Sequence, residues 1–213
     1  MTDLPQPVRL HTVSTAPNPR RVLAFMAHKG LKLPMVEYDM GVRAHYAPEY
    51  VAKAGRPVIP ALELETGEYL TESIAICRYL EALFPENPMF GRDALETAQI
   101  EMWQRRAEFE LLIPVAAVFR HSHPAMAGLE DQVPEWAKAN RARVLKGLAM
   151  LNARLSKTPF FGGEVFSVAD ITANITVDFM RVTKIAVPAD MTALLDWRAR
   201  MQAMPCFAFP AKR

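Results

Sequence analysis

The sequence predicts two domains: an α/β domain with the order strand, helix, strand, helix, strand, strand, helix, and then an all-helical domain. Short apolar runs alternate with helical patterns in the first 85 residues, and a Pro- and Gly-rich stretch follows them. Helical spacing of apolar residues then continues with no competing strand pattern. We therefore expect an α/β domain over residues 1–85, a linker over 86–93 and a helical domain over 94–213.

The first three elements are expected within the first 38 residues. Residues 8–13 partly alternate apolar and polar side chains, which favours a strand. Asn18 is a favourable helix cap and Pro19 suits a first helical position, so a helix is expected from there to Gly30. Residues 33–38 predict a second strand. The order strand, helix, strand favours a parallel pair with a crossover.

A weak helix, a hairpin and a stronger helix complete the first domain. The weak helix is expected around residues 48–51, and the hairpin joins apolar runs at 60–64 and 68–70 through Thr66-Gly67. The following helix is expected over residues 72–84. Its buried side is expected to carry Ile74, Cys77, Leu80 and Phe84.

The second half of the chain has helical patterns only. These cover residues 94–121, 135–157, 167–184 and 192–203. Ser167 and Asp170 have the spacing of a capping box, with Phe166 and Ile171 placed to staple the helix entry. We therefore assign Asp170 a structural role.

Composition and charge exclude several classes of partner. The chain has 213 residues, of which 51% are hydrophobic and 23% charged, and its formal net charge is +2. Because no run of like charge occurs, we expect neither nucleic acid nor a membrane as partner.

The start of the chain lacks a signal-peptide pattern. Two cysteines without a CxxC pair favour a reducing compartment, so a cytoplasmic protein is expected.

Four motifs in order resemble the cytosolic glutathione S-transferase family over nearly the full chain. They are Pro17–Val22 after the first strand, His45–Tyr50, Ile59–Leu62 with Glu72–Ile76, and the Phe166–Ile171 capping box. The resemblance implies a thioredoxin-like domain followed by a helix bundle, which is the glutathione transferase fold. It also implies a homodimeric detoxification enzyme that uses glutathione as substrate and needs no metal. Similarities to the plant phi and bacterial nu classes leave the class open, and a bacterial member is expected.

The resemblance also implies a set of glutathione-binding residues. Pro60 would follow a cis peptide bond, which turns the main chain of Ile59 outward to pair with the tripeptide. Glu72 and Ser73 open a helix and would hold the ammonium and carboxylate of the γ-glutamyl group. The alternatives are an ordinary proline that starts a strand and a plain first helical turn.

The glycine end of glutathione is expected at His45. Val58 stands where the family usually has a polar side chain, which weakens this end of the site, and Arg56 is a candidate to compensate. The alternative for His45 is a solvated loop side chain.

The group that activates the glutathione thiol departs from the family pattern. Thr12 stands at the position of the usual Tyr, and Ala16 stands at the position of the usual Ser. The segment Ala16-Pro17-Asn18 is similar to the Thr-Pro-Asn motif of the nu class, so Asn18 is the first candidate and Ser14 the second. The alternatives are that Asn18 only caps its helix and that Ser14 faces solvent.

In this family the acceptor pocket lies between the domains, which implies contacts from Trp103, Arg106 and Phe109. The expected activity is the transfer of glutathione to a small hydrophobic electrophile. A glutathione-dependent disulfide reductase and a non-catalytic binding module are the alternatives.

Overall fold

The computed structural model describes residues 4–209, which form two compact units. One unit contains residues 4–87 and 205–209, and the other contains Pro88–Met204. The second unit therefore begins inside the expected linker, because Met89 and Phe90 are buried in it and the carbonyl of Met89 accepts the Val168 N–H at 3.1 Å. Residues 205–209, expected in the helical domain, instead belong to the first unit, where the guanidinium of Arg20 lies 4.2 Å from the centre of the Phe209 ring.

A mixed four-stranded sheet forms the centre of the first unit. Its strands are β1 (Pro7–Thr12), β2 (Met35–Glu37), β3 (Ala61–Leu64) and β4 (Tyr69–Thr71), in the order β2-β1-β3-β4. The β1–β2 pair is parallel and the other two pairs are antiparallel. The parallel pair and the hairpin are both confirmed. Gly67 turns the hairpin at φ 84°, a conformation that glycine adopts without steric penalty.

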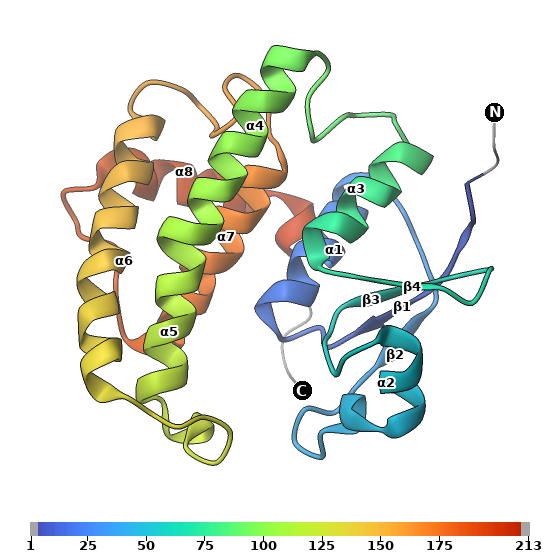
Figure 1. Cartoon of the computed structure of the whole chain (residues 1–213). Helices are drawn as coiled ribbons and strands as arrows, with labels where there is room; N and C mark the ends of the chain where they lie inside the picture. Colours follow the sequence, from blue (N-terminus) through green and yellow to red (C-terminus); the bar gives the residue numbers. More distant parts are fainter. Residues whose placement is uncertain (1–3, 210–213) are drawn as a thin grey trace. The chain divides into compact units, whose positions relative to one another are not determined.

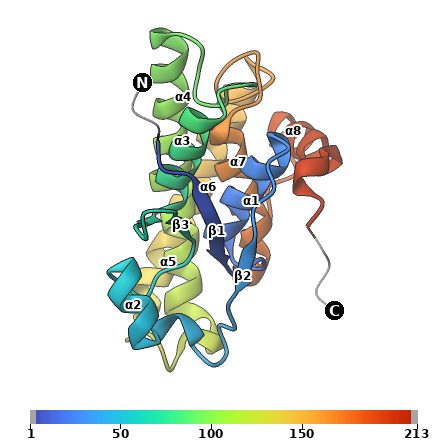
Figure 2. The same cartoon turned by 90° about the vertical axis from the view of Figure 1, so that its right-hand side faces the viewer.

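Helices cover both faces of this sheet (Figures 1 and 2). α1 (Pro17–His28) and α3 (Ser73–Leu83) lie on one face, and α2 (Pro48–Ala54) lies on the other after a 3₁₀ turn at Ala44–Tyr46. Leu10 and Leu62 are fully buried register partners, whereas the next pair, His11 and Ala61, faces α2. Because side chains alternate along a strand, one face forms the apolar core and the other carries polar groups.

Two local predictions for the first unit were wrong. The first helix begins at Pro17 with Ala16 as its cap, so Asn18 lies in the first turn and does not cap it. Pro17 has the fixed φ angle that suits a first helical position, so the helix begins earlier in the chain than predicted, at Pro17 and not at Pro19. In α3 the buried apolar residues are Ile76, Cys77 and Leu80, whereas Ile74 and Phe84 are only partly buried.

The second unit is a bundle of helices, as predicted. Its α-helices are α4 (Ala94–Arg106), α5 (Ile113–Ser122), α6 (Pro134–Leu155), α7 (Val168–Phe179) and α8 (Thr192–Ala203). Short 3₁₀ turns lie at Pro124–Met126 and Met180–Thr183, and another, in the first unit, at Pro205–Phe207.

The long helix expected over 94–121 is interrupted by a π-helical segment, η2 (Ala107–Leu112). Pro114 explains it, because proline has no N–H to donate to the carbonyl four residues earlier, Glu110, and its ring crowds that carbonyl. Gly147 of α6 then approaches closely: a Cβ atom on Gly147 would lie 2.3 Å from the Glu110 carbonyl oxygen. A proline and a glycine together therefore set how η2 and α6 pack.

The predicted capping box is present at the start of α7. The Asp170 carboxylate is fully buried and accepts the Ser167 N–H at 3.0 Å and the Ser167 hydroxyl at 2.9 Å. It also accepts the Phe161 N–H at 3.1 Å and the Trp197 indole N–H at 3.0 Å. Burial raises the pKa of Asp170 to about 6, against the opposing effect of these hydrogen bonds. Asp170 thus joins three segments of the bundle.

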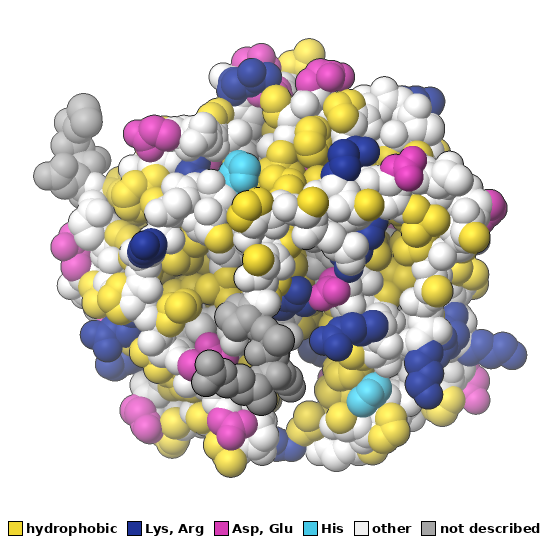
Figure 3. Space-filling model, turned by 180° about the vertical axis from the view of Figure 1, so that it is seen from behind, with side chains coloured by type: hydrophobic (Ala, Val, Ile, Leu, Met, Phe, Trp, Pro, Cys, Tyr) yellow, Lys and Arg dark blue, Asp and Glu magenta, His cyan; other side chains and the backbone are white. Residues whose placement is uncertain are grey.

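The surface is of mixed character. Figure 3 shows basic and acidic side chains interspersed with apolar ones on one face. Within residues 4–209, no helix combines the length and the apolar character needed to cross a bilayer. The same residues contain no group of three or more His, Cys, Asp or Glu side chains placed to hold a metal ion.

Candidate glutathione site

The candidate binding segments of the first unit meet at one edge of the sheet. His11 of β1 pairs with Ala61 of β3, and Ala61 pairs in turn with Thr71 of β4. Ser14 follows His11 by three residues, Pro60 directly precedes Ala61, and Glu72 directly follows Thr71. The strand register therefore brings together three segments that are far apart in the sequence.

The segment before β3 has the main-chain conformation that the resemblance implies. The Ile59-Pro60 peptide bond is cis. The Val58 N–H donates to the Arg56 carbonyl at 2.9 Å, and the Tyr50 hydroxyl donates to the Val58 carbonyl at 2.6 Å. With its own N–H and carbonyl bonded, Val58 leaves the Ile59 main chain as the part of this segment available to a ligand.

Glu72 and Ser73 form the start of α3. Glu72 is the cap residue and has φ 67° and ψ 112°, a positive φ that is unusual for a residue with a side chain. Its carboxylate side chain is 73% exposed and lies 3.8 Å from the Arg56 guanidinium. Ser73 follows as the first helical residue, so its N–H belongs to the helix N-terminus, which favours an anionic group. This start thus offers an exposed carboxylate beside main-chain donors.

His45 lies in the 3₁₀ turn before α2 and is 6% exposed. Its Nδ1 atom is buried and has no hydrogen-bond partner among the described residues. Burial lowers the pKa of His45, and the charge of Arg43 lowers it further. The imidazole is therefore neutral at pH 7, and one of its ring nitrogens is unused.

The two candidates for thiol activation, Ser14 and Asn18, differ in the hydrogen bonds that they already make. The Ser14 N–H and hydroxyl both donate to Glu37 Oε1, at 2.7 and 2.9 Å. The exposed Asn18 accepts a bond from Arg21 Nη2 at 2.8 Å through Oδ1, which leaves its amide NH₂ group as a donor. Thr12, at the usual Tyr position, has a fully buried side chain.

The three residues expected to contact the acceptor lie in the second unit and do not share one environment. Trp103 is 8% exposed, and its ring centre lies 6.0 Å from that of Phe161. The guanidinium of Arg106 lies 4.8 Å from the Trp103 ring centre. Phe109, by contrast, is 44% exposed. Trp103 is therefore a core residue of the bundle, whereas Arg106 and Phe109 are exposed.

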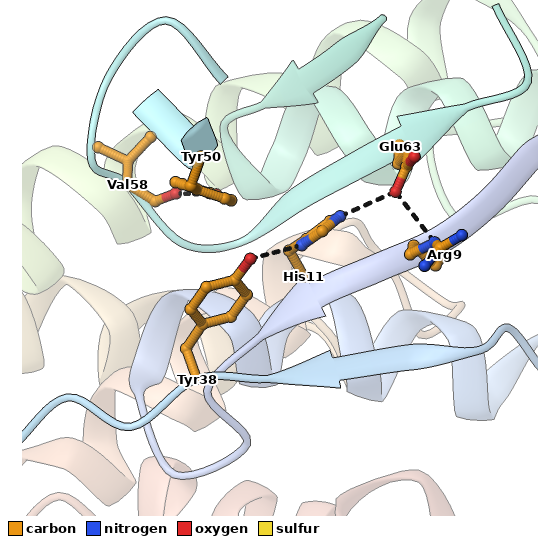
Figure 4. A network of polar contacts seen from close by, with 6 residues as sticks. All are labelled: Arg9, His11, Tyr38, Tyr50, Val58 and Glu63. Carbon is orange, nitrogen blue, oxygen red and sulfur yellow. Dashed lines mark hydrogen bonds and ion pairs between the residues drawn. The ribbon is translucent and has the colours of Figure 1, made fainter. Parts of the chain in front are cut away.

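Several residues near the site had no assigned role in the sequence analysis. They form a polar network on the α2 face of the sheet: His11 bonds to the Tyr38 hydroxyl at 3.0 Å and to Glu63 at 3.1 Å, and Arg9 also contacts Glu63 (Figure 4). Tyr50, which belongs to the His45–Tyr50 motif, packs beside this network against His11 and Tyr38. Strand pairing creates this network, and no short sequence pattern marks it.

Comparisons with known proteins identify the family. The family model described as the glutathione S-transferase N-terminal domain matches residues 15–83, and the model of the C-terminal domain matches residues 113–205. Glutathione S-transferase 2 of Saccharomyces cerevisiae is 32% identical over 204 residues, which cover 94% of this chain and 88% of that protein.

Solved structures give the same result over most of the chain. The crystal structure of Gtt2 from Saccharomyces cerevisiae has a TM-score of 0.87 and 33% identity, covering 93% of this chain and 98% of that one. A glutathione S-transferase domain-containing protein from Marinobacter aquaeolei has a TM-score of 0.88 and 31% identity, covering 94% and 100%. Sequence, site geometry and fold therefore agree that the chain belongs to the glutathione S-transferase family.

Proposed function

We propose that this protein conjugates the thiolate of glutathione to a small hydrophobic electrophile, as a detoxification enzyme of the cytoplasm. The observation that carries the proposal is the edge of the sheet where the cis Ile59-Pro60 turn and the Glu72-Ser73 helix start meet. Two features that suit a peptide ligand support it: main-chain groups for pairing and a helix N-terminus for a carboxylate. The buried free thiols of Cys77 and Cys206 suit a reducing compartment.

Glutathione would lie along the Ile59 main chain, with each end held by different groups. Glu72 would pair with the ammonium of the γ-glutamyl group, and the Ser73 hydroxyl and N–H would bind its carboxylate. His45 would donate a hydrogen bond to the glycine carboxylate at the other end through Nε2, since its Nδ1 atom is closed to solvent. Val58, whose N–H and carbonyl are already bonded within the chain, would only support the Ile59 main chain.

Asn18 is the proposed thiolate-stabilising residue, with Ser14 as the weaker candidate. The first turn of α1 contains Pro17 and Pro19, which carry no N–H, and the Arg20 N–H bonds to the Ala16 carbonyl at 3.1 Å. The Asn18 N–H is thus the main-chain donor that this turn offers, beside its side-chain amide. The Ser14 hydroxyl donates to Glu37, whose negative charge would oppose a nearby thiolate.

A pH series of conjugation to a chlorodinitrobenzene-type electrophile tests this proposal in wild type and Asn18→Ala. Wild type should react with an apparent thiol pKa below the free-thiol value of about 8.5. Because the variant loses the amide donor, its apparent pKa should rise by about one unit. Direct ultraviolet titration of the bound thiolate checks the assignment. An unchanged thiol pKa would exclude Asn18, and turnover of a small disulfide without conjugation would indicate the reductase instead.

The acceptor would contact Arg106 and Phe109, which are exposed, and not the buried Trp103.

We also propose a homodimer. Leu95 and Met102 support it, because they are exposed apolar residues seven positions apart and so share one face of α4. A solution mass of one 23.9 kDa chain would rule the dimer out.

A further inference from the structure

Tyr50 of α2 makes a single polar contact with the segment that carries the candidate glutathione-binding main chain. Its hydroxyl donates to the Val58 carbonyl at 2.6 Å, and the residue is only 4% exposed (Figure 4). Burial raises the pKa of Tyr50 far above the usual 10 of tyrosine, so the phenol stays protonated and remains a donor. Because the buried Tyr50 hydroxyl donates to the Val58 carbonyl, its position is fixed.

The ring of Tyr50 is fixed by its neighbours on the same face of the sheet. Its centre lies 5.2 Å from that of Tyr38, 5.7 Å from that of His11 and 6.3 Å from that of Tyr69. His11 in turn bonds to Tyr38 and Glu63, which holds the imidazole between two strands. Aromatic packing of this kind restricts the movement of the Tyr50 ring, and this keeps its hydroxyl in position to bond to Val58.

The Val58–Ile59 segment is thus held on both sides of the Val58–Ile59 peptide bond. The Val58 carbonyl accepts from Tyr50, and the Ile59 side chain packs against the cluster that contains Tyr50 and Ala61. The carbonyl of Val58 and the N–H of Ile59 belong to one rigid peptide plane. A bond that fixes the first therefore also fixes the direction of the second.

We infer that Tyr50 is a positioning residue for glutathione: its hydroxyl orients the Val58–Ile59 peptide so that the Ile59 main chain is ready to pair with the tripeptide. The inference rests on the proposed function, in which Ile59 is the pairing residue. Tyr50 touches neither the thiol nor the acceptor in this account. It prepares the binding surface, and preorganisation of this kind contributes to affinity.

This role predicts a particular kinetic signature for Tyr50→Phe. Because the ring remains, the variant keeps the aromatic cluster and loses only the bond to Val58. The KM for glutathione should rise about tenfold, as expected for the loss of one hydrogen bond that helps binding, with kcat at saturating glutathione nearly unchanged. The KM for the electrophile should not change.

Two matched tyrosine variants separate positioning from a general loss of stability. The Tyr79 hydroxyl donates to the Pro5 carbonyl at 2.7 Å, which is the same type of bond in the same unit away from the Val58–Ile59 segment. Tyr38→Phe removes a hydroxyl of the aromatic network without touching Val58. Both variants should keep the KM for glutathione within about twofold of wild type, because Tyr79 bonds to Pro5 and not to Val58, and because Tyr38→Phe keeps the ring that packs against Tyr50.

A tenfold rise in KM for glutathione in Tyr50→Phe alone supports the inference. If Tyr50→Phe behaves as wild type, or if Tyr79→Phe weakens glutathione binding equally, Tyr50 has no positioning role. If the wild-type protein itself shows no saturation with glutathione, the proposed function fails and the inference fails with it.

Discussion

At the scale of single residues, His45 combines burial with an unused hydrogen-bonding atom. A buried polar atom without a partner, such as Nδ1 of this ring, carries an unfavourable desolvation energy. The lowered pKa of this imidazole, caused first by burial and then by Arg43, means that it would meet the proposed ligand in its neutral form at pH 7. Its charge therefore contributes to binding only at lower pH.

This charge state predicts how glutathione affinity depends on pH. The pKa of His45 lies below 6.5 in the free protein. Binding to a carboxylate favours the protonated ring, so affinity should be flat from pH 8 to 7 and should rise as the pH falls below 6.5. We expect about a threefold to tenfold gain by pH 5 for one partly buried ion pair. Fluorescence or calorimetric titration at each pH measures this gain.

His45→Gln is the control, because it keeps a hydrogen-bond donor but does not titrate. Its affinity should not rise between pH 6.5 and 5. The ligand for both proteins in this series is S-methylglutathione, because the thiol of bound glutathione would itself titrate; the carboxylates of this ligand titrate below about 4, so its charge does not change over this interval. A wild-type profile that is also flat would remove His45 from the glycine end of the site.

At the scale of elements, the contact between η2 and α6 depends on a residue with no side chain. Gly147 lies in the middle of α6, where Ala would ordinarily favour the helix by about 1 kcal/mol. The Glu110 carbonyl leaves no room for a Cβ atom there, since the two would be 2.3 Å apart. Gly147→Ala should therefore lower the free energy of unfolding by about 1–3 kcal/mol despite the better helix propensity. Urea denaturation measures the change.

Gly128→Ala is the matched control, because a Cβ atom at Gly128 would meet nothing within 4 Å. Its free energy of unfolding should stay within about 0.5 kcal/mol of wild type. Equal stability of wild type and Gly147→Ala would show that η2 and α6 can move apart without penalty.

The same elements show where prediction from the sequence succeeds and where it fails. The hairpin and the α7 capping box were predicted because each depends on residues close in the chain, Thr66-Gly67 and Ser167 with Asp170. The π-helical segment was not predicted, although Pro114 inside the expected helix is a local signal for a break in its hydrogen bonding. What it does to Glu110 depends on the packing of α6, which no local pattern contains.

At the scale of the whole molecule, motif order allowed the family and both domains to be predicted, but the site only in part. The cis peptide bond before Pro60 is present as the resemblance implied. The sequence predicted neither the hydrogen bond from Tyr50 to Val58 nor the one from Ser14 to Glu37, since both depend on contacts between separate strands and helices. Site residues that act through tertiary contacts are invisible to a reading of local patterns.

Both proposals for this protein depend on a tripeptide site at one edge of the sheet. Calorimetric titration of the wild-type protein with reduced glutathione tests that claim most directly. The account predicts saturable heat with one glutathione per chain and a dissociation constant of about 1 mM or tighter. An absence of heat at millimolar concentrations of reduced and of oxidised glutathione would contradict it.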